Sequence, residues 1–161
     1  MNNVLYIIIS FVIKHIILFI FNDFRLFCDA FSVLIQKTRF GVRSDGNPAL
    51  RYFQAKDFEN LQAEDISFVS DKGQTLRGCI YSDMRVKEPK GLVIWVHGFG
   101  AGHNAYTTEI AYLAAQGYLV LGYDNTGCVL SDGKGVGGLI QGAIDASYAV
   151  RYVQNEPRLK Q

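Results

Sequence analysis

Four short runs of apolar residues follow one another in the second half of the chain, separated by polar or glycine-containing segments. Residues 64–70 and 75–83 flank a loop whose Gly73 can take the positive φ angle that hairpin connections require. Residues 91–98 and 118–124 are instead almost continuously apolar, which is typical of strands covered on both faces. The pattern therefore predicts a hairpin followed by two buried strands.

Helical periodicity appears between and after the two buried strands. Residues 104–117 place apolar side chains on one face and end at Gly117, a common helix stop. Residues 139–154 show the same period, and Pro157 bars further helix. The order of elements predicts an α/β fold in which a hairpin feeds a parallel βαβ sheet.

The longest apolar run lies at the N-terminus. Residues 4–21 hold fourteen Val, Leu, Ile and Phe side chains, and at ~1.5 Å per residue a helix of this length would cross a hydrocarbon core of ~30 Å. Lys14 and His15 interrupt the run. A central lysine disfavours membrane insertion by about 2.5–3.5 kcal/mol, but the fourteen apolar residues favour it by ~4–8 kcal/mol. We expect an N-terminal apolar helix that anchors the chain in a membrane; an interfacial or core helix is the alternative.

Charge is unevenly distributed along the chain. Residues 1–43 carry five Lys and Arg against two Asp and Glu, so the remainder sums to −2. Because cytoplasmic flanks of membrane spans are enriched in basic residues, we expect the part after the apolar run to face the cytoplasm. The predicted organisation is membrane-anchor and interfacial helices in residues 1–40, a linker in 41–60 and the α/β domain in 61–161.

Composition argues against several classes of function. The slightly acidic remainder has no basic stripe, which disfavours nucleic-acid binding. The three cysteines, Cys28, Cys79 and Cys128, are widely spaced and odd in number, so neither a zinc site nor a disulfide framework is indicated.

A run of alternating glycines, HGFGAG, follows the third predicted strand, and one function for it is dinucleotide binding. Gly100, Gly102 and Ala105 fit the pattern G-x-G-x-x-A, and Asp124 ends the next strand, where a ribose partner would lie. Against this interpretation, residues 97–99 intervene between the strand and the first required glycine.

The other function is an oxyanion hole. When a nucleophile attacks an ester or amide carbonyl, backbone N–H groups aimed at the developing anion contribute about 2.7–4 kcal/mol each. Glycines allow the backbone to turn such groups inward.

Two segments, HGFGAG and GYDNTGCVLSDG, resemble α/β-hydrolases of the serine aminopeptidase and monoacylglycerol lipase type. The resemblance covers residues near 60–155 and implies the N-terminal half of an α/β-hydrolase fold. It implies that His97 and Gly98 close the third strand and that Phe99 gives one oxyanion N–H. Asp124, Gly127 and Ser131 form the pattern Asp-x-x-Gly-x-x-x-Ser, which resembles the loop that follows the fourth strand in this family.

Several of these residues also have structural interpretations. We expect His97 to hydrogen-bond the loop and not to act as a base, and Asp124 to order the loop that it begins. Ser131 lacks the strand-to-helix elbow of a nucleophile. His103 and Asn104 fit either a solvated helix start or a substrate contact.

The catalytic serine motif is absent from the sequence. No G-x-S-x-G occurs, and the acid and base that would follow it are not identified. The resemblance implies that residues 92–96 form an open sheet edge, because the missing fifth strand would lie there. We expect the N-terminal portion of a membrane-anchored serine hydrolase that needs no metal or cofactor; the alternative is a non-catalytic half that pairs with a separate C-terminal chain.

Overall fold

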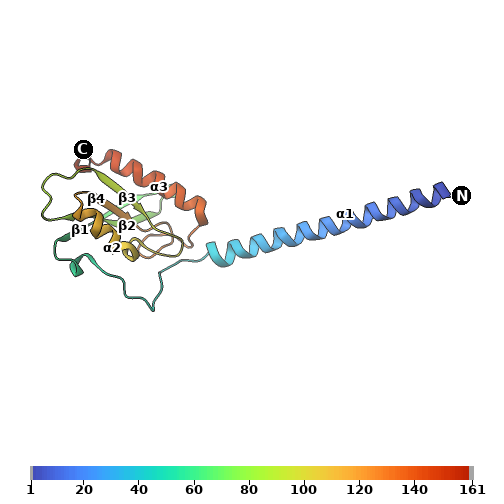
Figure 1. The fold of residues 1–161 in the computed structure, drawn as a ribbon, viewed down its shortest axis with the longest axis horizontal. Coiled ribbons are helices and arrows are strands. Elements are labelled where there is room, and N and C mark those ends of the chain that lie inside the picture. The colour runs from blue at the N-terminus through green and yellow to red at the C-terminus, as the bar shows by residue number, and fades with distance from the viewer. Residues whose placement is uncertain (1, 160–161) are drawn as a thin grey trace. The chain divides into compact units, whose positions relative to one another are not determined.

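The computed structural model describes residues 2–159, and their side chains from residue 13 onward. The chain divides into two compact units, Met1–Arg39 and Phe40–Gln161. Figure 1 shows a long helix in the first unit and a sheet with helices in the second.

The first unit holds the helix α1 (Asn2–Ile35), which continues into a π-helical turn at Gln36–Phe40; the last residue of this turn, Phe40, begins the second unit. Within the described residues no helix combines the length and apolarity needed to cross a membrane. The membrane span expected over residues 4–21 lies partly outside the residues whose side chains are described, and it stays a prediction. From residue 13 onward, every 18-residue stretch of α1 contains Asp23, Arg25 and Asp29, whose transfer into hydrocarbon is costly. The side chains of residues 4–12 lie outside the described part.

The second unit is built on a four-stranded sheet with the order β1-β2-β4-β3. The strands are β1 (Leu61–Val69), β2 (Thr75–Asp83), β3 (Leu92–Val96) and β4 (Leu119–Tyr123). Strands β1 and β2 form the predicted hairpin, β2 pairs antiparallel with β4, and β3 runs parallel to β4. The prediction that the third strand lies at the sheet edge is confirmed.

Two helices cover opposite faces of this sheet because side chains alternate along each strand. The helix α2 (Thr107–Ala115) follows a 3₁₀ turn at His103–Tyr106, and its buried side chains pack with Val120 of β4. The helix α3 (Gly138–Asn155) packs with Leu121 on the other face. Figure 1 shows the sheet between these two helices. The predicted hairpin feeding a βαβ unit is therefore confirmed.

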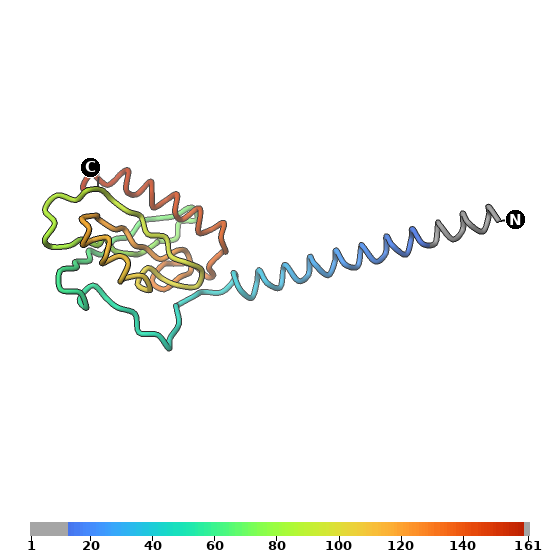
Figure 2. The backbone as a smooth tube through the Cα atoms, in the orientation of Figure 1, coloured from blue at the N-terminus to red at the C-terminus, as the bar shows by residue number. Residues whose placement is uncertain are grey.

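The segment of residues 41–46, at the start of the second unit, lies against the loops that follow β4. Ser44 donates its N–H to Gly127 O at 2.9 Å and accepts the Val129 N–H at 2.9 Å. The Arg43 guanidinium donates to three carbonyl oxygens in the same region, those of Val129, Ser131 and Gly133. The tube in Figure 2 shows this segment running along the loops of the second unit.

Candidate functional site

The HGFGAG segment forms a tight turn at the carboxyl end of β3, and His97 holds it. Its ring is buried, and its Nε2 atom accepts the Asn125 N–H at 2.9 Å. Because Nε2 is the acceptor, the proton lies on Nδ1, which donates to Gly98 O at 2.8 Å. Burial lowers the pKa of His97, which favours this neutral form. His97 thus has the structural role predicted for it.

The turn continues through Gly98, Phe99 and Gly100. The Gly98 N–H donates to the Tyr106 hydroxyl at 3.2 Å, and Gly100 has φ +76°, a conformation that other residues rarely adopt. Within the described part of the chain, the Phe99 N–H donates to no protein acceptor. This is the donor that the resemblance assigns to the oxyanion.

Asp124 connects the two loops that meet at this end of the sheet. It is fully buried, and its Oδ1 atom accepts both the backbone N–H and the Nδ1–H of His103, at 2.9 and 2.8 Å. Its Oδ2 atom accepts the Leu130 N–H at 3.1 Å. Burial acts to raise the pKa of Asp124, but the hydrogen bonds and charge of His103 outweigh it, and the pKa is lowered. Asp124 does order the loop that it begins.

These contacts rule out two expectations. Since both Asp124 oxygens are occupied and buried, Asp124 has no free acceptor for a ribose, and the dinucleotide interpretation of Gly100, Gly102 and Ala105 is wrong. His103 is 5% exposed, so it is not part of a solvated helix start. The contact between His103 and Asp124 joins two loops, so no periodic pattern in the sequence could have predicted it.

The remaining predicted residues shape the loops. Ser131 is buried, donates to Asp124 O and accepts the Arg77 N–H at 2.9 Å, so its hydroxyl is committed and it is not a nucleophile. A Cβ on Gly102 would lie 2.7 Å from Asp124 Oδ1, and a Cβ on Gly127 would lie 2.4 Å from a neighbouring carbonyl oxygen. Both glycines allow the loops to approach closely.

A cavity of about 230 Å³ lies beside the turn, between the end of β3 and the start of α3. Its wall is mainly apolar; it includes Val96, Phe99, Val136, Leu139, Ala143 and Ala146. The Phe99 ring is 60% exposed and packs edge-on against Phe40 at 5.3 Å between centroids. An apolar group in this cavity would lie beside Phe99.

Residues 87–155 match the family described as serine aminopeptidase, S33. The matched range includes β3, α2, β4 and nearly all of α3, and with them the turn and the Asp124 loop. No curated protein matches the chain.

Solved structures match a longer part of the chain. The Pyrococcus furiosus esterase Pf2001 superposes with a TM-score of 0.60 at 18% identity, over 72% of this chain and 44% of its own. Brefeldin A esterase, a bacterial homologue of human hormone sensitive lipase, gives a TM-score of 0.54 at 16% identity, over 72% and 32%. The chain therefore has part of the α/β-hydrolase fold. The α/β hydrolase GrgF from Penicillium sp. sh18 gives 0.50 at 24% identity, over 60% and 33%.

The chain spans less than half the length of each of these solved structures. The resemblance seen in the sequence is confirmed, since the family match and the fold agree. At these identities the structural neighbours show the fold, and the activity has to be argued from the site.

Proposed function

We propose that this chain is the N-terminal part of a serine hydrolase that cleaves an ester, acylglycerol or peptide bond, and that it supplies the oxyanion turn. The observation that carries the proposal is the Phe99 N–H, which has no acceptor among the described residues and lies at the carboxyl end of β3. His97 and Tyr106 both bond to the backbone of Gly98, the residue that precedes Phe99. A donor fixed in this way can stabilise a developing oxyanion without reorganising first.

In this proposal the nucleophile, the acid and the base come from a further segment. The sequence contains no G-x-S-x-G, and the Ser131 hydroxyl is buried and bonded on both sides. We infer that residues 1–161 alone form no acyl-enzyme. Turnover requires a nucleophile placed next to the Phe99 N–H.

The open edge of β3 favours a second candidate, a non-catalytic half that pairs with a separate C-terminal chain. Strand β3 pairs with β4 on one side only, so its other side offers backbone N–H and C=O groups for an added strand. The two candidates differ in whether the missing residues belong to the same polypeptide. Membrane attachment by residues 1–40 and a cytoplasmic location stay predictions in both.

Fluorophosphonate labelling tests the proposal, because the probe reacts only with an activated serine. We expect no labelling of the chain alone and labelling of the added segment when the chain is expressed with the sequence encoded downstream. Labelling of the chain alone, abolished by Ser131→Ala, would overturn the assignment of a missing nucleophile. Absence of labelling in both cases would overturn the hydrolase proposal itself.

The oxyanion role has a backbone test in the complemented enzyme. Phe99→Pro removes the N–H, and we expect kcat for ester hydrolysis to fall by about 10²–10³. Phe99→Ala keeps the N–H and serves as the matched control, with kcat largely retained. Equal losses in both variants would show that the side chain, not the N–H, matters.

A further inference from the structure

Residues 40–44, which we call the strap, are bonded to the loop that follows β4. The Ser44 N–H donates to Gly127 O and the Ser44 O atom accepts the Val129 N–H, both at 2.9 Å. The Arg43 guanidinium donates to three carbonyl oxygens of the same loop at 2.8–2.9 Å; they belong to Val129, Ser131 and Gly133. A guanidinium presents several donors in one planar fork, which suits carbonyls that converge in this way.

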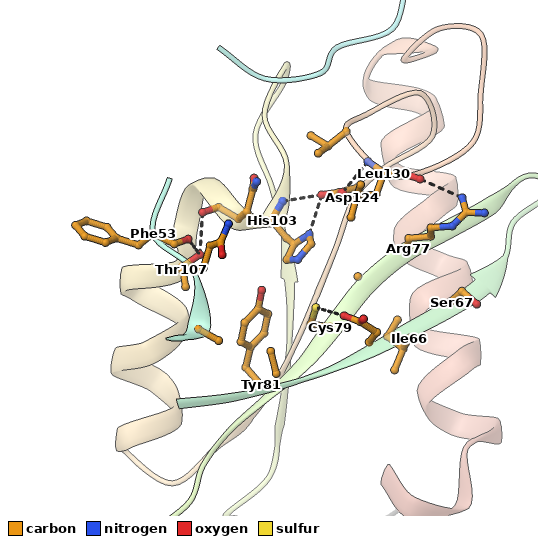
Figure 3. Close-up of a pocket in the computed structure, with 17 residues that line it drawn as sticks. Phe53, Ile66, Ser67, Arg77, Cys79, Tyr81, His103, Thr107, Asp124 and Leu130 are labelled. Carbon is orange, nitrogen blue, oxygen red and sulfur yellow. Dashed lines mark hydrogen bonds and ion pairs between the residues drawn. The ribbon is translucent and has the colours of Figure 1, made fainter. Parts of the chain in front are cut away.

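The loop under the strap is itself held by the sheet. Figure 3 looks into a cavity on the α2 face of the sheet and shows Asp124 bonded to His103 and to Leu130. On the far side of the loop, the Asp132 N–H donates to Thr75 O of β2 at 2.9 Å. The strap therefore rests on a loop that is anchored at both ends.

Two side chains of the strap reach the other loop of the site, the turn after β3. The Ser44 hydroxyl donates to Gly100 O at 2.8 Å. The Phe40 ring lies edge-on against the Phe99 ring, with 5.3 Å between the centroids. Ser44 thus connects its own anchored backbone to the backbone of the oxyanion turn.

The bond from Ser44 restrains the peptide group between Gly100 and Ala101 at one end, and a second bond restrains the other end. The oxygen of this peptide accepts from Ser44, and its N–H, which belongs to Ala101, donates to Gly98 O at 3.3 Å. Glycine is conformationally permissive, so a turn built on Gly98 and Gly100 keeps one orientation only if groups outside it hold the backbone. Ser44 is such a group, and Ala101 passes its restraint on to Gly98.

The orientation of Gly98 O decides the direction of the Phe99 N–H. The described residues contain no cis peptide bond, and in a trans peptide the C=O and the N–H point in opposite directions. Gly98 O accepts from the Ala101 N–H and also from His97 Nδ1. Because two donors hold this oxygen on one side, the Phe99 N–H points to the other side, where no acceptor from the described part of the chain meets it.

We propose that Ser44 is a positioning residue of the oxyanion turn, which holds the Gly100 carbonyl and through it the direction of the Phe99 N–H. Arg43 keeps Ser44 on the anchored loop, and the Phe40 ring restrains the Phe99 side chain. This role rests on the oxyanion function proposed for Phe99. An N–H group stabilises a developing anion best when it is aimed before the reaction begins. A looser turn should therefore slow the chemical step and leave substrate binding unchanged.

The first measurement is amide hydrogen exchange in the full chain, which needs no enzymatic activity. Ser44→Ala should speed the exchange of the Ala101 N–H about fivefold, because one hydrogen bond that holds its peptide is lost. Ser44→Thr keeps the hydroxyl and should leave the exchange rate unchanged. Ser67→Ala makes the same change at an exposed position of β1 and is the matched control. Equal exchange at Ala101 in Ser44→Ala and Ser67→Ala would overturn the proposal.

The contribution of Arg43 is measured in the same way. Arg43→Lys keeps the positive charge but loses the planar fork, so we expect the Val129 and Ala101 N–H groups to exchange about tenfold faster. Arg51→Lys changes an exposed residue of the same type nearby and should leave both rates unchanged. Unchanged exchange at both amides in Arg43→Lys would show that Arg43 does not hold the strap.

Kinetics of the complemented enzyme separate positioning from folding. Fluorophosphonate labelling counts the active sites, so kcat is expressed per labelled site and a loss of folded protein does not lower it. Ser44→Ala should lower kcat about five- to tenfold at unchanged KM, and Ser44→Thr should restore it. Labelling with an unchanged kcat in Ser44→Ala would overturn the role of Ser44 and leave the hydrolase proposal standing. Absence of labelling in every variant and in the unmodified enzyme would instead overturn the hydrolase proposal, and with it the oxyanion role.

Discussion

The backbone N–H of Asn125 donates to His97 Nε2 across 28 residues of sequence, at 2.9 Å. This bond joins the turn after β3 to the loop after β4, and it is made only while the ring is neutral. The same ring donates from Nδ1 to Gly98 O, next to the proposed oxyanion N–H of Phe99. The geometry of the turn is therefore linked to the protonation of His97.

Acid should destabilise the second unit through His97. Burial lowers the pKa of His97 in the folded chain. Below the unfolded value of about 6.5, His97 is therefore protonated in the unfolded chain while it stays neutral in the folded chain. The contribution to stability is complete above this pH and is lost as the pH falls towards the folded pKa. The free energy of unfolding in urea is measured at about pH 7.5 and at about pH 5.5. Lowering the pH should reduce it less in His97→Gln than in the unmodified chain. Equal losses would show that His97 does not carry the acid sensitivity.

Removal of the Asp124 charge should cost far more than removal of a nearby surface charge. Asp124→Asn leaves His103 and the Leu130 N–H without their buried carboxylate, and we expect a loss of about 3–5 kcal/mol in the free energy of unfolding. Asp132→Asn is the matched control, because its ion pair with Arg77 is about half exposed; its cost should stay below about 1 kcal/mol. Denaturant unfolding of both variants measures the difference, and similar costs would contradict the central role of Asp124.

The sheet was predictable because its pattern is local. The continuous apolar runs at residues 91–98 and 118–124 correspond to β3 and β4, and their lack of alternation reflects helices on both faces. The helix start was less accurate: the pattern placed it at residue 104, whereas α2 begins at Thr107, after a 3₁₀ turn over His103–Tyr106.

The long-range contacts of the site could not be predicted from the sequence. Nothing in residues 40–46 indicates that Ser44 pairs with Gly127, because main-chain hydrogen bonds of an extended segment impose no periodicity on side chains. The link between His103 and Asp124 also depends on loops that meet only in three dimensions. Motif similarity identified Asp124 as a member of the loop, and the structure shows what it binds.

Close packing of the two loops predicts a steric effect at Gly102. Its φ angle of −120° is open to any residue, but a Cβ there would lie 2.6 Å from Val129 Cγ2 and 2.7 Å from Asp124 Oδ1. Gly102→Ala should therefore lower the free energy of unfolding by about 1–3 kcal/mol. Gly91→Ala, whose Cβ would meet nothing closer than 4.0 Å, should change it by less than about 0.5 kcal/mol. If the two variants unfold at the same denaturant concentration, the loops are not in contact at Gly102.

The open edge of β3 should make the chain associate with itself. The two outer strands differ: β1 carries Glu64 and Asp65, whereas residues 92–96 of β3 are all apolar and Val96 is 48% exposed. Charged side chains discourage strand pairing at an edge, and an apolar edge without them favours it. Val96→Lys should therefore reduce concentration-dependent association in sedimentation velocity. Leu139→Lys, which changes an even more exposed apolar residue on α3, should reduce it less. An equal or larger effect of Leu139→Lys would mean that general surface apolarity, and not the unpaired strand, drives the association.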